Sequence, residues 1–248
     1  MKFPADFQIL FATRILRLFG YGMVSLILVI YLSYLGFVKS QISLLLTLSL
    51  IGDVIISLGI TLSADRCGRK RMLVISAALI SLAGFIFFAT HNFLLLLLVA
   101  VIGVISPSGA EVGPFLPIEQ AALAQIIHDK KRTAVFAWYH LMGFVATATG
   151  SLCAGFLLHR LSGNGFTTLE SYRLIMLIYA LLGILMGILF MQLSPAIETG
   201  RQVKSSLASN AFQKYFGLHE SRSTVLKLSA LFAVDAFGGG FILQSLMA

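Results

Sequence analysis

Charged residues are scarce in this 248-residue chain, which has only 10 acidic side chains and 11% charged residues in all. A soluble globular domain carries about 25% charged residues, so this sequence cannot cover a core with a water-exposed surface. Cysteine is also rare: Cys67 and Cys153 lie far apart, which implies no disulfide or metal framework. H-E-x-x-H, G-x-S-x-G and P-loop motifs are absent, so we expect no enzyme activity, no metal and no cofactor.

Long apolar sequence is abundant instead, since 58% of the residues are hydrophobic. Runs of roughly 20 apolar residues, enough to cross ~30 Å of hydrocarbon as a helix, recur along the chain. We therefore expect an all-α membrane protein embedded in the lipid bilayer. No cleavable signal peptide is expected, because Arg14 and Arg17 interrupt the first apolar run. The predicted spans are residues 8–35, 42–64, 72–90, 93–127, 133–158, 173–193 and 227–248.

The fourth predicted span is too long for one straight crossing. Pro107, Gly109 and the Gly113-Pro114 pair interrupt its helical hydrogen bonding, so we expect a kinked helix that ends in a cytoplasmic turn. Irregular backbone at membrane depth is tolerated where protein or a water-filled cavity covers it. Residues 106–117 are therefore a candidate part of a translocation path.

The basic residues indicate the orientation of the chain. With the N-terminus in the cytoplasm, all of the 18 Lys and Arg residues except Lys39, Arg160 and Arg173 lie on the cytoplasmic side. This positive-inside bias predicts a multi-pass protein of the inner or plasma membrane with a cytoplasmic N-terminus. The net charge of +8 is thus a topology signal, and no nucleic-acid partner is expected.

A short basic loop joins the second and third predicted spans. It reads Ala64-Asp65-Arg66-Cys67-Gly68-Arg69-Lys70-Arg71. The loop resembles A-D-R-x-G-R-[KR]-[KR], which joins helices 2 and 3 of major facilitator transporters. Thr61 and Ser63 depart from the first glycine and the leucine of the family form.

The resemblance implies a role for this loop. In the family it is similar to a latch, in which the aspartate and arginines pair with neighbouring helix ends in one access state. Asp65 and Arg69 would then control closure at the cytoplasmic end rather than contact substrate. The implied gating residues are Asp65, Arg66, Gly68, Arg69 and Lys70.

The resemblance also implies an organisation for the whole chain. Residues 1–193 would form the six-helix N-terminal bundle, residues 194–226 the central cytoplasmic loop, and residues 227–248 the seventh helix. Family members have about twelve helices in two repeats. We therefore expect the chain to be truncated or to need a second polypeptide as its missing C-terminal half.

An F-G-x-G motif occurs in the first span and again in the seventh. It begins at Phe19 and at Phe237, and one ionisable residue, Arg17 or Asp235, precedes it at the same offset. Two parallel repeats would place these motifs at helices 1 and 7, although glycine pairs also occur simply where helices pack closely. If the repeat is real, Arg17 and Asp235 approach each other, directly or through substrate, in one access state.

Ionisable residues inside the spans are the candidates for chemistry, because a charge at the membrane centre costs roughly 2.5–3.5 kcal/mol. Asp53 is either a proton or substrate site or a structural partner of Arg14 or Arg17. The candidate residues of a translocation path are Arg17, Asp53, Glu111, His140 and Asp235.

The fourth and fifth spans supply three of these ionisable side chains. Glu111, at the break, is the expected proton-binding group, whereas Glu119 is expected only to cap the cytoplasmic part of its helix. His140 either relays protons, stacks on a ligand, or is a packed interior residue.

The function we expect is secondary active or facilitative transport of a small solute by alternating access, with proton coupling as one option. The alternative is a truncated, non-transporting half-carrier or subunit. Ser151 and Ala154 replace a proline and a glycine of the pattern that drug–proton antiporters show in helix 5, which weakens the case for drug efflux.

Overall fold

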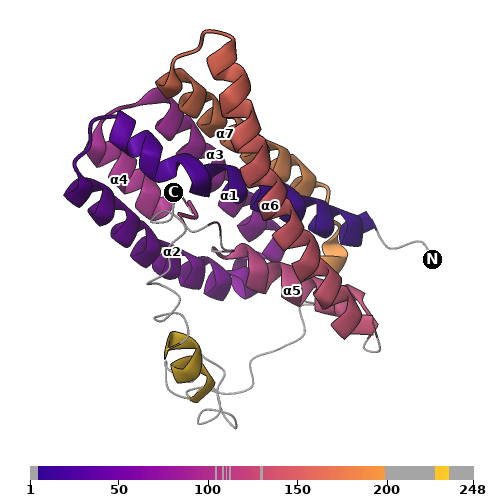
Figure 1. The fold of residues 1–248 in the computed structure, drawn as a ribbon. Helices are drawn as coiled ribbons and strands as arrows, with labels where there is room; N and C mark the ends of the chain where they lie inside the picture. The colour runs from indigo at the N-terminus through magenta and orange to yellow at the C-terminus, as the bar shows by residue number, and fades with distance from the viewer. Residues whose placement is uncertain are drawn as a thin grey trace. The chain divides into compact units, whose positions relative to one another are not determined.

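The computed structural model describes residues 5–103, 105–107, 109, 111, 113–128, 131–198 and 227–234, and these are helical with connecting turns and no strand. The chain divides into two compact units, residues 1–199 and residues 200–248. In the second unit, residues 227–234 are helical. The elements of the first unit (Figure 1) are α1 (Ala5–Tyr34), α2 (Lys39–Cys67), α3 (Arg69–Ala89), α4 (Phe93–Ile102), α5 (Phe115–Ile126), α6 (Arg132–Gly163), α7 (Thr168–Met191) and the 3-10 turn η2 (Pro195–Ile197).

Five of these helices, α1, α2, α3, α6 and α7, are long and apolar enough to cross a membrane. Each lies on one of the predicted apolar runs, so the predicted fold class, an all-α membrane protein, is confirmed. The last predicted span is described only over residues 227–234, and Asp235 lies outside the described residues.

The fourth predicted span is two short helices rather than one kinked helix, which corrects the prediction. α4 has 10 residues and α5 has 12, and residues 103–114 between them, here the inter-helix segment, are not helical where the structure describes them. Gly109 and Gly113 have φ values of +69° and +97°, which L side chains rarely adopt. Pro114 follows directly and disfavours helical backbone at the residue before it. The two glycines and the proline therefore interrupt the helix between α4 and α5 instead of bending it.

Helix α1 packs against both α6 and α7, while α3 packs against α7 and α2 against α4 (Figure 1). The backbones of α1 and α6 come into direct contact at two glycines. A Cβ atom added at Gly22 would lie 2.1 Å from the carbonyl oxygen of Thr147, and one added at Gly150 would lie 2.1 Å from that of Phe19. Small residues permit such close crossings of membrane helices. The crossing fixes the face of α1 that meets α6.

This contact predicts opposite effects for two glycines of the same helix. Gly150→Ala is expected to destabilise the protein by ~1–3 kcal/mol, because the new methyl group overlaps the α1 backbone. Gly155→Ala is the matched control, because no atom beyond the adjacent backbone of α6 lies within 4 Å of a Cβ at that position. It is expected to be neutral or to stabilise α6 by up to ~1 kcal/mol through helix propensity. Thermal unfolding of both purified variants in detergent checks this, and equal shifts would contradict the crossing.

Large apolar side chains cover the outer faces of α2 and α6. Val54, Phe144 and Leu152 are 66%, 72% and 74% exposed, respectively. Large apolar side chains exposed in this number contact lipid or other protein rather than water. The chain is therefore a multi-pass integral membrane protein.

Candidate functional site

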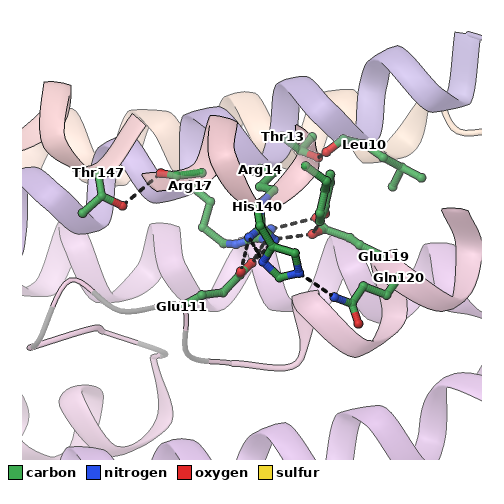
Figure 2. Close-up of polar contacts among 11 residues, drawn as sticks. Leu10, Thr13, Arg14, Arg17, Glu111, Glu119, Gln120, His140 and Thr147 are labelled. Carbon is green, nitrogen blue, oxygen red and sulfur yellow. Dashed lines mark hydrogen bonds and ion pairs between the residues drawn. The ribbon is translucent and has the colours of Figure 1, made fainter. Parts of the chain in front are cut away.

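Two arginines and two glutamates meet inside the helical bundle (Figure 2). Arg14 and Arg17 come from α1, Glu111 from the inter-helix segment and Glu119 from α5. We refer to these four residues as the ionic cluster. The side chains of Arg17 and Glu119 are fully buried, Arg14 is 3% exposed and Glu111 is 11% exposed. Glu111 is thus the most accessible member.

Arg17 and Glu119 form a two-pronged ion pair. Arg17 Nη1 donates to Glu119 Oε1 and Arg17 Nη2 to Oε2, each over 2.7 Å. The hydroxyl of Tyr139 on α6 donates a further hydrogen bond to Glu119 Oε2. Paired guanidinium–carboxylate bonds of this geometry are among the strongest in proteins. This pair therefore ties α1, α5 and α6 together.

The Glu111 carboxylate lies between both guanidinium groups. Its Oε1 accepts from Arg14 Nη1 over 2.8 Å and from Arg17 Nη2 over 2.6 Å. Its Oε2 lies 2.6 Å from Arg14 Nη2. One carboxylate is thus clamped by two cations, while the backbone that carries it is not helical.

Local sequence explains why the two arginines converge. They are three residues apart on α1 and therefore lie on the same face of that helix. The Arg14 guanidinium lies 4.0 Å from the ring centre of Tyr139, and that of Arg17 lies 4.4 Å from the ring centre of Phe115. Gly143 lets α6 approach, since a Cβ atom there would be 2.9 Å from Arg14 Nε. Aromatic rings and a glycine hold both cations in place.

The cluster is electrically balanced, with two cations and two anions. Isolated charges are expensive at membrane depth, and a buried ion pair is tolerated only when its partners and hydrogen bonds are complete. Here the Nε atoms of Arg14 and Arg17 have no hydrogen-bond partner in the part of the chain that the structure describes. The arginines therefore offer more donors than the two glutamates use.

His140 contacts the cluster from α6. Its Nδ1 lies 3.3 Å from Arg14 Nη2, and its Nε2 lies 3.2 Å from the side-chain amide of Gln120. Arginine can only donate, so His140 Nδ1 accepts in the contact with Arg14. His140 thus extends the polar contacts of Arg14 towards α5.

Asp53 lies apart from the arginines and holds the inter-helix segment. It is 7% exposed, and its carboxylate accepts from the backbone N–H of Gly113 over 3.2 Å and from the hydroxyl of Ser57 over 3.4 Å. The hypothesis that it is a structural partner of Arg14 or Arg17 is therefore wrong. The physical reason is that both arginines are already neutralised by Glu111 and Glu119.

The basic loop that follows α2 is bound to a carboxylate from beyond α7. Gly68 forms the turn with φ +100°, and α3 begins at Arg69. Glu198 Oε2 accepts from the backbone N–H of Arg69 over 2.8 Å, and its Oε1 accepts from that of Lys70 over 3.2 Å. A negative charge at a helix N-terminus is favourable because unpaired N–H groups and the helix dipole meet it there.

The side chains of the loop reach the same segment. Arg69 Nη1 donates to the carbonyl of Ile197 over 3.3 Å, and Lys70 Nζ donates to that of Leu193 over 2.7 Å. Arg66 is exposed in the last turn of α2, and the side chain of Asp65 lies outside the described residues. The chain after α7 thus fastens the start of α3.

Glu198 therefore supports a specific prediction about α3. Glu198→Ala is expected to expose the amides of Arg69 and Lys70 to hydrogen exchange, at a cost of about 1 kcal/mol from the lost cap. Glu170→Ala is the control, because Glu170 accepts from the backbone of Thr167 at the start of α7 instead. Exchange measured by mass spectrometry should change at α3 in the first variant alone. Unchanged protection at α3 in Glu198→Ala would contradict this role.

The comparison with known protein families agrees with the helical architecture. The family model described as Major Facilitator Superfamily matches residues 10–248. The chain belongs to the major facilitator superfamily. The family that the sequence predicted is thereby confirmed, and its members are associated with membrane transport.

Two relatives of this superfamily member place it more closely. It is 31% identical over 266 residues to the uncharacterised membrane protein YJR124C of Saccharomyces cerevisiae, covering 98% of this chain and 59% of that protein. It is 32% identical over 178 residues to the quinolone resistance protein NorA of Staphylococcus aureus, covering 71% of this chain and 42% of NorA. The chain thus spans about half the length of the curated relatives that it matches.

Sequence reasoning assigned the wrong role to Glu119 and missed three other residues. Glu119 does not cap a helix end: it is fully buried one turn into α5 and pairs with Arg17. The first predicted span contains two arginines and the fourth contains two glutamates, and this match was the signal that could have shown the pairing. The partners that the sequence did not single out are Asp6, Tyr139 and Glu198. Asp6 accepts hydrogen bonds from Ser194 and gives the chain after α7 a second attachment.

Proposed function

We propose that this chain takes part in transport of a small organic solute by alternating access, with the ionic cluster in the translocation path. The observation that carries the proposal is that two arginines and two glutamates lie almost completely buried among apolar helices. Ionisable residues at membrane depth usually mark ion or substrate pathways, because their cost must be offset by function. The superfamily membership supports the same conclusion.

The two halves of the cluster serve different roles in this proposal. Arg17 and Glu119 form a static pair, because both sit on helices and both are fully buried. Glu111 is the movable member, because it sits on non-helical backbone and keeps some exposure. Irregular backbone at membrane depth is stable where it lines a cavity or is covered by protein. The inter-helix segment would therefore line the path.

Glu111 is also the proposed proton-binding group. It faces Arg14 and Arg17 from α1 and lies near Glu119 and His140 through those arginines. A proton on Glu111 would remove its negative charge and leave one arginine without a compensating anion. The segment would then move until a solute or a second carboxylate restored neutrality. Asp235 stays the predicted counterpart of Arg17 on the seventh helix.

The gating role of the basic loop is likewise proposed. With the N-terminus in the cytoplasm, the contacts of Arg69 and Lys70 with residues 193–198 would lie at the cytoplasmic end of the bundle. They would hold α3 and the chain after α7 as one body while the path opens and closes. Asp65 and Arg66 would add contacts in another access state.

NorA suggests a specific cargo class for the test. Because NorA is a quinolone resistance protein, export of quinolones is the second candidate function. The alternative, a half-carrier, predicts instead that the chain is recovered from its own membranes in complex with a second polypeptide.

The experiment is solute-driven proton movement in liposomes that contain the purified chain and an internal pH dye. Quinolones and small organic acids are added in turn to wild-type protein and to Glu111→Gln. We expect proton movement with at least one solute for the wild type and none for the variant. Both proteins are compared well below the unfolding temperature of the variant, which is lowered because Arg14 loses its anion. Folded wild-type protein that moves neither protons nor labelled solute, alone or with a co-purified partner, would overturn the proposal.

A further inference from the structure

The Glu111 carboxylate occupies a position that resembles a bound ligand. Three contacts of 2.6–2.8 Å join it to Arg14 and Arg17, and both of its oxygens are used. The planar guanidinium group of arginine can donate two parallel hydrogen bonds to one carboxylate, which a lysine ammonium group cannot do. The two guanidinium groups thus form a receptor for one carboxylate, and Glu111 fills it here.

Glu111 can leave its ion pairs more easily than Glu119 can, because the two differ in backbone structure, burial and additional hydrogen-bond donors. Glu119 sits on α5, is fully buried and has the Tyr139 hydroxyl as an additional donor. Glu111 sits on non-helical backbone near the positive-φ glycines Gly109 and Gly113, and its side chain is 11% exposed. Of the two anions, Glu111 can withdraw with a change confined to the inter-helix segment.

Withdrawal of Glu111 would leave the receptor intact but unbalanced. Arg17 would keep Glu119, while the described contacts left to Arg14 would be Nδ1 of His140 and the face of Tyr139. A buried guanidinium without an anion is costly at membrane depth, so another anion would be drawn in. The buried Nε atoms of both arginines also have no hydrogen-bond partner in the described residues, so donors remain for a second carboxylate.

We propose that Arg14 and Arg17 form a binding site for a solute bearing a single carboxylate, which takes the place that Glu111 holds in this structure. The inference rests on the proposed transport function, since it names the class of solute. Aromatic groups on such a solute would meet the rings of Tyr139 and Phe115, which already contact the two arginines. Glu111 is then a competitor for the site as well as a proton acceptor.

Binding to the purified chain tests the inference without requiring transport. The probes are acetate, hexanoate and benzoate, with benzamide as the neutral isostere of benzoate and chloride as an inorganic anion. Dissociation constants are taken from the concentration dependence of thermal stabilisation, since a ligand stabilises the state that it binds. We expect at least one carboxylate to bind Glu111→Gln about tenfold more tightly than the wild type, and benzamide to bind neither.

Two further proteins make the assignment specific. Arg14→Lys keeps the charge but loses the fork, so in the Glu111→Gln background it should abolish the tighter binding. Arg17 is left unchanged, because its loss would disturb Glu119. Glu170→Gln removes an exposed carboxylate at the start of α7 and should bind each probe as the wild type does.

Three other outcomes overturn the site, and a fourth overturns the transport proposal alone. If none of the carboxylates binds Glu111→Gln more tightly than the wild type, Glu111 does not compete for a ligand. Chloride that stabilises as well as the carboxylates would show a general anion site, and tight binding that survives Arg14→Lys would place the ligand elsewhere. Carboxylate binding without any solute-driven proton movement would retain this site and reject the transport proposal instead.

Discussion

Arg17→Gln is expected to destabilise the protein by ~3–5 kcal/mol, because it leaves the fully buried Glu119 without a cation. Arg17 also contacts Glu111, so two carboxylates lose a partner at once. The measurement is the free energy of unfolding of the purified chain in mixed micelles. Arg160→Gln is the matched control: Arg160 is exposed near the end of α6, where its guanidinium lies 5.1 Å from the Phe156 ring centre. Its loss should cost less than ~1 kcal/mol.

The double variant Arg17→Gln with Glu119→Gln separates the energetic contribution of the ion pair from that of side-chain packing. Two amides keep similar volumes and can hydrogen-bond to each other and to Tyr139, with no uncompensated pair partner. We expect the double variant to be more stable than the sum of the two single effects predicts, with a coupling of about 2 kcal/mol or more. Strict additivity would mean that the pair makes no energetic contribution of its own.

The long apolar runs made the membrane helices predictable from the sequence. Hydrophobic length is a strong signal that needs no partner, so α1, α2, α3, α6 and α7 were found close to their observed bounds. The basic loop was recognisable because Gly68 and its neighbours match a short family pattern. Its binding partner was not, since Glu198 lies about 130 residues later and nothing local marks it.

The pairing of buried charges is where sequence reasoning fell short. Asp53 was a reasonable partner for Arg14, because the two lie on neighbouring predicted spans. The structure pairs Arg14 with Glu111 instead, across 97 positions of sequence, and gives Asp53 the backbone N–H of Gly113. Which carboxylate reaches which arginine depends on the rotation of each helix and on the path of the inter-helix segment. Neither can be read from hydropathy, because Asp53 and Glu111 are both acidic residues in apolar spans.

Arg14→Glu is expected to have the largest effect of any single change considered, because it places three carboxylates around one guanidinium. The variant should fail to accumulate in membranes or should unfold far below the wild-type temperature, at a cost above the ~3–5 kcal/mol of a lost partner. The exchange variant, Arg14→Glu with Glu111→Arg, restores two cations and two anions. Expression and thermal stability should therefore recover substantially, which tests the contact between residues 14 and 111 directly.

Transport should not recover with stability in the exchange variant. The proposed site needs two adjacent guanidinium groups on one rigid helix, and the exchange moves one of them to the inter-helix segment while placing a carboxylate on α1. A stable exchange variant without solute-driven proton movement would show that the order of charges matters, and not merely their balance. Full activity in that variant would mean that the cluster only supports the fold, and the translocation path would then have to lie elsewhere. Within the ionic cluster, Glu111 is the residue that combines partial exposure with non-helical backbone. Moving its carboxylate to α1 therefore tests whether the cluster serves transport or only supports the fold.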